Sequence, residues 1–479
     1  MVWRELRLGL GVLITSAGVL LVRFLVPRPV GMADNGDGWR LLCQLGAKEA
    51  DRPAEKFVRF AYHSAPACDS AYISSQAWLD KFASALGRLF GLPSVLNLVV
   101  LGVLCCVLFA LGVTAIVLGL RLSTRDRIIA TVLLLLVVAD SAFFGYVASV
   151  LSEGAAFAGI VLLCGGLLLM NRPGAWRYTG AVVTVLGAMI GINAKTQTLL
   201  LLPFFVLALA FVRAPGSRGL ARWALPVAVL AVVGTGTALK QGTGDPANAE
   251  YREANMYHVV FDSIVDGRHD AAADLAELGL PPEFAKYAGS TWWSANSATK
   301  DPSYGRYRDR ISRRNVAHFY LTHPLRTVEI LHRSAQEVLT ARVPNLGSFG
   351  EGSGQAPLAK EYRVPVLSGV TGFLAPLGLF FLLPLWLVIL WLGVRAFRRR
   401  SGRREIGVVT LMLLLFACGQ FLASGLGEGI EGVKHQQLTL FPTLLAAVFA
   451  GIGLLPRRTG EETLPEPEVA AKSVPGRTT

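Results

Sequence analysis

A succession of long apolar runs constrains this chain most, because roughly 20 consecutive apolar residues satisfy their backbone in lipid only as a helix. Ten runs meet this description: 7–26, 93–120, 127–145, 154–170, 178–193, 197–213, 222–240, 366–395, 406–424 and 438–455. Only 16% of residues are charged, against about a quarter in a soluble domain. The sequence therefore predicts an all-α integral membrane protein with about ten transmembrane helices.

Basic residues in the connections predict the topology, since cytoplasmic loops carry an excess of lysine and arginine. Arginines gather near the N-terminus and in every second connection: Arg4, Arg7, Arg121, Arg125, Arg127, Arg172, Arg177, Arg213, Arg218, Arg222, Arg395, Arg398, Arg399, Arg400, Arg403, Arg404, Arg457 and Arg458. This pattern predicts a plasma (inner) membrane protein with both termini in the cytoplasm. The segments left outside are 27–92, 146–153, 194–196, 241–365 and 425–437.

The order of these segments predicts four parts. Residues 1–240 form an N-terminal transmembrane bundle that includes the outer loop 27–92, and 241–365 form a large outer loop with amphipathic helices. Residues 366–456 form the C-terminal transmembrane helices, and 457–479 a disordered cytoplasmic tail, since that tail is polar and rich in Pro and Glu. The net charge of +13 is explained by the arginines that fix the membrane topology. We expect no nucleic-acid partner, because the basic residues form no single patch.

Two features of the large outer loop stand out. His323-Pro324 predicts a break between two helices, because a residue before proline avoids the helical region. Five arginines crowd the start of the first of these helices: Arg306, Arg308, Arg310, Arg313 and Arg314. A solvated or headgroup-facing side is the favoured interpretation of this cluster, and a funnel that attracts phosphate is the functional alternative.

The first outer loop ends in an amphipathic stretch. Its large apolar side chains share one helical face while Lys81 and Arg88 lie elsewhere, and the apolar set is Trp78, Phe82, Leu86, Leu89 and Phe90. We expect this helix to lie on the membrane surface. Cys43 and Cys68 share the oxidising side, where either a disulfide or two unpaired thiols is consistent with the sequence.

Unexplained polar residues gather at the outer ends of the predicted spans: Asp34, Asp37, Asp140, Glu153, Lys195, Gln197, Glu428, Glu431, Lys434 and His435. Ionisable residues beside spans are costly and often functional. Their one-sided placement predicts a site at the outer interface. It argues against a transport path, which needs polar residues at several depths.

The segment Ala33–Arg40 carries the strongest candidate within this set. A turn explains Asp34 and Asn35 well, but explains Asp37 less well. Asp37 is the predicted catalytic base, with Asn35 and Arg40 as substrate-binding neighbours. The glycines on either side of Asp37 are expected to let a substrate approach the backbone.

The remaining candidates each have a competing structural explanation. Glu153 can complement the positive N-terminus of the following helix, whereas Asp140 lies at the wrong end of its own helix for that role and is predicted to bind metal, acceptor or arginine. Lys195 suits a phosphate or, equally, a lipid headgroup. A solvated turn is favoured for Glu428. Other predicted substrate-binding residues are Gln197, Glu431, Lys434 and His435.

These motifs together resemble the GT-C class of membrane glycosyltransferases, and within it the hexose transferases of bacterial surface-glycan assembly. The resemblance uses short motifs in a fixed order: Asn35-Gly36-Asp37, Asp140 through Tyr146 to Glu153, Ala194-Lys195-Thr196-Gln197, Phe319 to Pro324, and Glu428 to His435. It implies that Asp37 is the base, that Asp140 and Glu153 are further acidic site residues, and that Lys195, Lys434 and His435 contact the donor phosphate. Members with a paired acidic motif in the first loop differ from this chain, in which Asp34 and Asp37 are separated. This difference argues against metal dependence, so no cofactor is assigned, although a divalent metal is possible.

The combined prediction is a glycosyltransferase that moves a sugar, a hexose by resemblance, from a polyprenyl-phosphate donor. The acceptor would be a cell-envelope glycan, glycolipid or protein on the outer face, and membrane lipid is a further partner. Two alternatives remain: a polysaccharide polymerase or ligase that uses Arg306–Arg314 and His323, and a lipid-linked sugar flippase.

Overall fold

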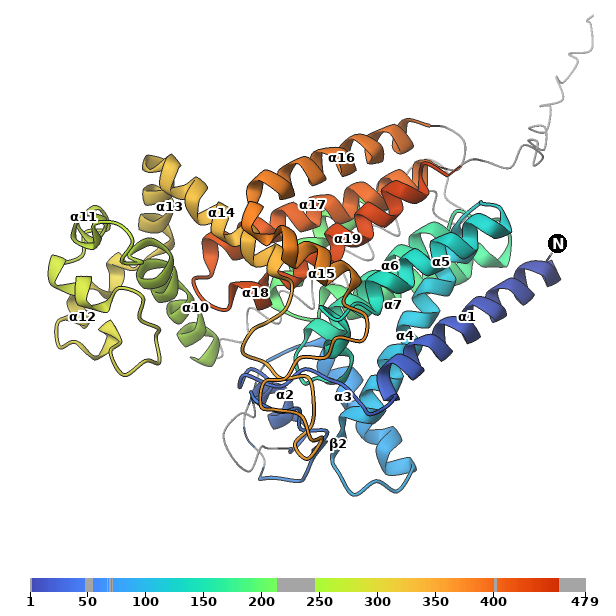
Figure 1. The fold of residues 1–479 in the computed structure, drawn as a ribbon, viewed down its shortest axis with the longest axis horizontal. Helices are drawn as coiled ribbons and strands as arrows, with labels where there is room; N and C mark the ends of the chain where they lie inside the picture. The colour runs from blue at the N-terminus through green and yellow to red at the C-terminus, as the bar shows by residue number, and fades with distance from the viewer. Residues whose placement is uncertain are drawn as a thin grey trace, which may run out of the picture.

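The computed structural model (Figure 1) describes residues 2–47, 55–66, 68, 70, 72–212, 246–399 and 403–455. The predicted span 222–240 and the predicted tail 457–479 lie outside these residues. Apolar helices form one bundle, and they are α1 (Val2–Leu25), α4 (Leu98–Gly119), α5 (Thr124–Val138), α6 (Glu153–Leu169), α7 (Ala175–Ile192), η2 (Thr196–Leu200), α8 (Leu201–Phe211), α15 (Val366–Leu374), η8 (Ala375–Leu377), α16 (Leu379–Arg398), α17 (Arg404–Gly427) and α19 (Gln437–Ile452).

Five helices of the described residues are long and apolar enough to cross a membrane: Trp3–Leu25, Leu98–Gly119, Ala175–Ile192, Leu379–Arg398 and Arg404–Gly427. Shorter apolar helices, such as α6, are packed among them. The predicted all-α membrane class is thereby confirmed. The predicted number of ten spans stays a prediction.

Two predicted spans have different limits in the structure. The run 366–395 is interrupted, because Gly378 adopts a left-handed conformation (φ 49°) between η8 and α16. The run 127–145 contains a helix only as far as Val138, after which the chain turns and forms the 3₁₀ helix η1 (Phe144–Ala148). Asp140 therefore follows the end of α5 instead of lying within a span.

The first outer loop contains α2 (Trp39–Gln44), α3 (Ser75–Leu89) and the short strand β1 (Ala61–Tyr62). β1 pairs antiparallel with β2 (Leu96–Asn97), which lies directly before α4. The end of the large loop is joined to this loop by backbone hydrogen bonds. Ala33 N donates to Gly347 O, and Val58 N donates to Phe349 O. The two outer segments thus form one layer over the same end of the bundle.

The large loop has its own helices: α10 (Pro246–His258), the π-helix η4 (Val259–Ile264), α11 (Ala271–Glu277), η5 (Pro282–Tyr287), η6 (Ala298–Lys300), α12 (Tyr304–Tyr307), η7 (Arg308–Arg310), α13 (Arg313–Thr322) and α14 (Pro324–Thr340). Figure 1 shows α10 to α13 set to one side of the bundle. Tyr257, Phe261, Phe284 and Phe319 belong to a hydrophobic core separate from that of the bundle. The predicted break at His323-Pro324 is confirmed between α13 and α14.

The predicted amphipathic helix is also present, as α3. Its small and polar side chains face the bundle, whereas Trp78, Phe82, Leu89 and Phe90 are exposed. Its place on a membrane surface remains an expectation. Cys43, in α2, and Cys68 are joined by a disulfide.

Helices α6 and α7 pack closely because glycines remove side chains from their contact. A Cβ atom placed on Gly159 would lie 2.1 Å from the backbone N of Gly191, and one on Gly166 would lie 2.4 Å from the backbone N of Thr184. Small residues that let backbones approach are the usual basis of helix association in lipid. α6 begins at Glu153, so this packing also fixes the position of that predicted site residue.

We expect Gly159→Ala to destabilise the protein by about 1–3 kcal/mol, because the added methyl group forces two backbones apart. Thermal unfolding of the detergent-purified variant measures this effect. Gly18→Ala is the matched control, since a Cβ on Gly18 in α1 meets no atom within 4 Å. Equal stability of the two variants would contradict the close α6–α7 contact.

Candidate active site

Charged and polar side chains from four separate segments meet at one end of the bundle. The loop before α2 supplies Asp37, the start of α6 supplies Glu153, and the connection between α7 and η2 supplies Lys195 and Gln197. The fourth segment is the turn after α17 together with α18 (Gly432–His435). We call the joined set the polar cluster, and its members are Asn35, Asp37, Arg40, Glu153, Lys195, Gln197, Glu428, Glu431, Lys434 and His435.

Lys434 occupies the centre of the polar cluster. Its ammonium donates to Asp37 Oδ2 and, over 3.1 Å, to Glu431 Oε2. The Lys434 side chain is only 2% exposed, whereas that of Asp37 is 36% exposed. The carboxylate of Asp37 is therefore held from the buried side and remains accessible from outside.

The charges around Asp37 set its ionisation. Burial alone would raise the pKa of Asp37, but the Lys434 ammonium, with help from Arg40 and Lys195, holds that pKa far below its usual range. Burial would likewise lower the pKa of Lys434, yet Asp37, Glu431 and Glu153 raise it well above the usual value. Both partners are charged across the physiological pH range.

The loop that presents Asp37 is organised by Asp34, as the turn interpretation predicts. Asp34 Oδ1 accepts hydrogen bonds from the backbone N–H groups of Gly36 (3.0 Å) and Gly38 (2.9 Å). Gly36 has φ 102°, and a Cβ on Gly38 would lie 2.2 Å from Val150 Cγ2. The expected role of Gly38 in substrate approach is wrong, because its Cα faces protein.

Glu431 is held in an unusual backbone conformation beside this loop. Its φ of 55° is left-handed, which costs a non-glycine residue about 1–2 kcal/mol. The side chain accepts a hydrogen bond from the amide of Asn35 while it also accepts from Lys434. Asn35 and Glu431 thus tie the first outer loop to α18, and strain of this kind tends to concentrate at functional sites.

Glu153 and Lys195 form a second ion pair in the polar cluster. Lys195 Nζ lies 2.8 Å from Glu153 Oε1, and the two side chains are 14% and 2% exposed. Lys195 also lowers the pKa of Asp37, although it does not touch it. The position of Lys195 therefore has a structural explanation, which is its buried acidic partner Glu153.

Gln197, Glu428 and His435 form a third group. The Gln197 amide donates to Glu428 over 2.6 Å and lies 3.1 Å from His435 Nδ1, while His435 Nε2 lies 2.7 Å from Glu428 Oε2. The interpretation of Glu428 as a solvated turn residue is therefore wrong. It could not be recognised from the sequence because its partner Gln197 is more than 200 residues away.

Asp140 is the predicted site residue that the structure places elsewhere. Its carboxylate accepts hydrogen bonds from the backbone N–H groups of Ala142, Leu367 and Ser368. Leu367 and Ser368 belong to the first turn of α15, where an acidic side chain is favourable. No recorded contact within the described residues joins Asp140 to the polar cluster, so its burial has a structural explanation.

Aromatic residues around Arg40 were missed by the sequence analysis. The guanidinium of Arg40 lies 4.4 Å from the ring centroid of Tyr72 and 4.5 Å from that of Tyr251, and 3.7 Å from Asp37 Oδ1. Trp39 Nε1 donates to the hydroxyl of Tyr251 over 3.3 Å. Tyr251 comes from α10, so the large outer loop contributes to one side of the site.

His258, at the end of α10, was also missed. Its Nε2 accepts a hydrogen bond from the backbone N–H of Trp292 over 2.9 Å. Burial lowers its pKa to about 4 despite the nearby carboxylates of Glu431 and Glu428. The imidazole is therefore neutral at physiological pH.

The side chains of the polar cluster also bear on metal binding. The part of the chain that the structure describes holds no group of three or more His, Cys, Asp or Glu side chains that could bind a metal ion. The carboxylates of the polar cluster bind lysine, amide or imidazole groups instead. The described residues of the polar cluster, as arranged, do not fit a metal.

Comparisons with known proteins address the family. The model of the YfdI N-terminal transmembrane domain matches residues 4–454. The chain belongs to this family. The assignment to the YfdI N-terminal transmembrane domain agrees with the apolar bundle and includes every member of the polar cluster. No curated protein matches the sequence.

Two solved structures show a distant similarity to this YfdI-family chain. They are the Archaeoglobus fulgidus oligosaccharyltransferase with a tethered acceptor peptide (14% identity, TM-score 0.40, 93% of this chain and 49% of that one) and ArnT from Cupriavidus metallidurans (14% identity, TM-score 0.29, 91% and 75%). The chain thus spans about half the length of the archaeal protein.

Removing one partner of the Glu153–Lys195 pair should destabilise the fold by about 3 kcal/mol or more, because the other charge stays buried. We expect Glu153→Gln and Lys195→Gln each to lower the melting temperature, and the double variant to lose less than the sum. Lys286→Gln is the control, since Lys286 pairs with Asp301 but is 59% exposed. Additive losses would show that the buried charges do not interact.

Proposed function

We propose that the polar cluster is the active site of a membrane glycosyltransferase on the outer face of the plasma membrane. The donor would be a sugar, by resemblance a hexose, on a polyprenyl phosphate. The acceptor would be a hydroxyl of a cell-envelope glycan, glycolipid or protein. The observation that carries this proposal is the accessible carboxylate of Asp37 held against the buried ammonium of Lys434.

Asp37 would act as the base. The acceptor oxygen attacks the anomeric carbon of the donor sugar, the bond from that carbon to the phosphate oxygen breaks, and its electron pair leaves with the phosphate. The proton of the acceptor hydroxyl passes to Asp37. This carboxylate suits the role because it is ionised and partly exposed, and a positioned base contributes about 10²–10⁴-fold in rate.

Lys434 would stabilise the leaving phosphate, whose negative charge grows as the bond breaks. Lys195 and Arg40 supply further positive charge near Asp37. Each of these cations has a protein carboxylate as its partner. Donor binding would therefore exchange one anionic partner for another and would not leave a buried charge unpaired.

The polymerase or ligase alternative depends on the arginines of the large loop. Arg308 pairs with Glu253 over an exposed surface, and no ion pair within the described residues joins Arg306, Arg308 or Arg310 to the polar cluster. The structure thus offers these arginines no acidic or nucleophilic partner at the proposed site. We favour the transferase with Asp37 as base for that reason.

Asp37→Asn should reduce sugar transfer in isolated membranes by at least about 100-fold, because the amide cannot accept the proton. Transfer from a panel of labelled polyprenyl-phosphate sugars measures this loss, with the amount of inserted protein as the reference. Asp309→Asn, which removes an exposed carboxylate from the large loop, should transfer normally.

The triple variant Arg306→Gln, Arg308→Gln and Arg310→Gln separates the two enzymatic proposals. The transferase proposal expects it to retain most of its activity. Near-normal transfer by Asp37→Asn, together with loss in the triple variant, would replace our proposal with the polymerase or ligase.

Lys434→Gln should change the pH dependence of transfer. Lys434 holds the pKa of Asp37 well below its ordinary value, so its removal raises that pKa and fewer molecules carry the ionised base as the pH falls. The acid limb of the kcat/KM profile should therefore move to higher pH, and the KM for donor should rise. An unmoved acid limb in a folded variant would show that Lys434 does not tune the base.

A further inference from the structure

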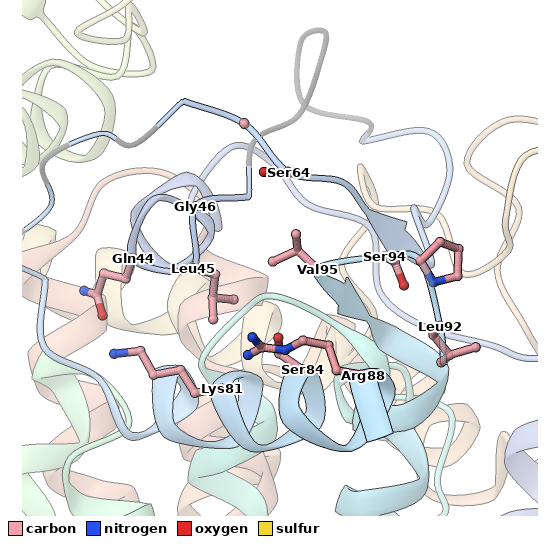
Figure 2. Close-up of a pocket in the computed structure, with 12 residues that line it drawn as sticks. Gln44, Leu45, Gly46, Ser64, Lys81, Ser84, Arg88, Leu92, Ser94 and Val95 are labelled. Carbon is pink, nitrogen blue, oxygen red and sulfur yellow. The ribbon is translucent and has the colours of Figure 1, made fainter. Parts of the chain in front are cut away.

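A cleft of about 480 Å³ lies at the opposite end of α2 from Asp37. It opens between the end of α2, residues 64–65, helix α3 and the turn 92–95. Figure 2 shows Lys81, Ser84 and Arg88 along α3, with Ser64 and Ser94 across from them. None of the described residues that line it is acidic.

Two cations on this lining have no protein partner in the described part of the chain. Lys81 and Arg88 are seven residues apart, so they project from the same side of α3, two turns from each other. Neither side chain forms an ion pair or hydrogen bond with another described residue. Serine hydroxyls beside them can donate hydrogen bonds to the same anion.

The apolar side of α3 borders these cations. Leu89 and Phe90 are 77% and 73% exposed, and Trp78 and Phe82 are also exposed on the same helix. A helix with a large apolar face and flanking basic residues lies at a membrane interface, with its cations at the depth of the lipid phosphates. A phosphate in the cleft would therefore have its acyl or prenyl chains beside Trp78 and Phe82.

We propose that this cleft binds the phosphate of a membrane lipid, with Lys81 and Arg88 as its cationic ligands. The same chemistry is offered by a glycerophospholipid headgroup and by a polyprenyl phosphate, the carrier that the proposed reaction would release. A bound lipid would hold α3 against α2, the helix that presents Arg40 to Asp37. The site needs no catalytic residue, so it stands independently of the proposed transferase activity.

Native mass spectrometry of the full detergent-purified chain tests this site by titration with short-chain phosphatidylglycerol, with a short polyprenyl phosphate and with phosphatidylcholine. The wild type should bind at least one of the two acidic lipids more tightly than phosphatidylcholine. Lys81→Gln/Arg88→Gln should bind that lipid at least about ten-fold more weakly, given about 1 kcal/mol for each interfacial cation. Preference for phosphatidylglycerol identifies a structural lipid, and preference for polyprenyl phosphate identifies the carrier.

Lys56→Gln/Arg59→Gln is the matched control, since it removes the same charge from the same outer loop but lies outside the cleft lining. It should bind acidic lipid as the wild type does. Melting temperatures confirm that each variant is folded. The proposal is overturned if Lys81→Gln/Arg88→Gln retains wild-type binding, if the control loses as much, or if phosphatidylcholine binds equally well.

Discussion

The structure of the polar cluster depends on the buried ammonium of Lys434. Desolvating a charge is costly unless it is paired, and the side chain of Lys434 is 2% exposed. Two carboxylates pair with it. Asp37 comes from a segment almost 400 residues earlier in the chain, and Glu431 comes from the same turn as Lys434. This one requirement explains why the first outer loop is fixed by the Asp34 turn, why Glu431 tolerates a left-handed backbone, and why Asn35 links the two segments.

The sequence predicted the parts of this arrangement that follow from polarity. Membrane helices, the amphipathic α3 and the break at His323-Pro324 each follow from a local pattern, and the structure contains all three. Nine of the ten predicted site residues meet in the polar cluster, because a charge beside a span must find a partner and all of these lay at one end. The roles that we assign to Asp37 and Lys434 remain predictions.

The errors came from contacts between distant segments. Asp140 was judged by the helix that it follows, whereas its carboxylate serves the start of α15, more than 220 residues later. Glu428 was assigned to solvent because its partners Gln197 and His435 could not be inferred from spacing. The interruption at Gly378 was missed because the apolar run continues through it. The tyrosines around Arg40 carry no sequence signal at all, since they come from two unrelated loops.

The most direct test is a structure of the protein with a non-reactive polyprenyl-phosphate sugar analogue. Our account predicts that a phosphate oxygen lies within hydrogen-bonding distance of Lys434, and that the carboxylate of Asp37 is released toward the anomeric carbon. A phosphate bound among Arg306–Arg314, with Lys434 still paired to Asp37, would contradict it.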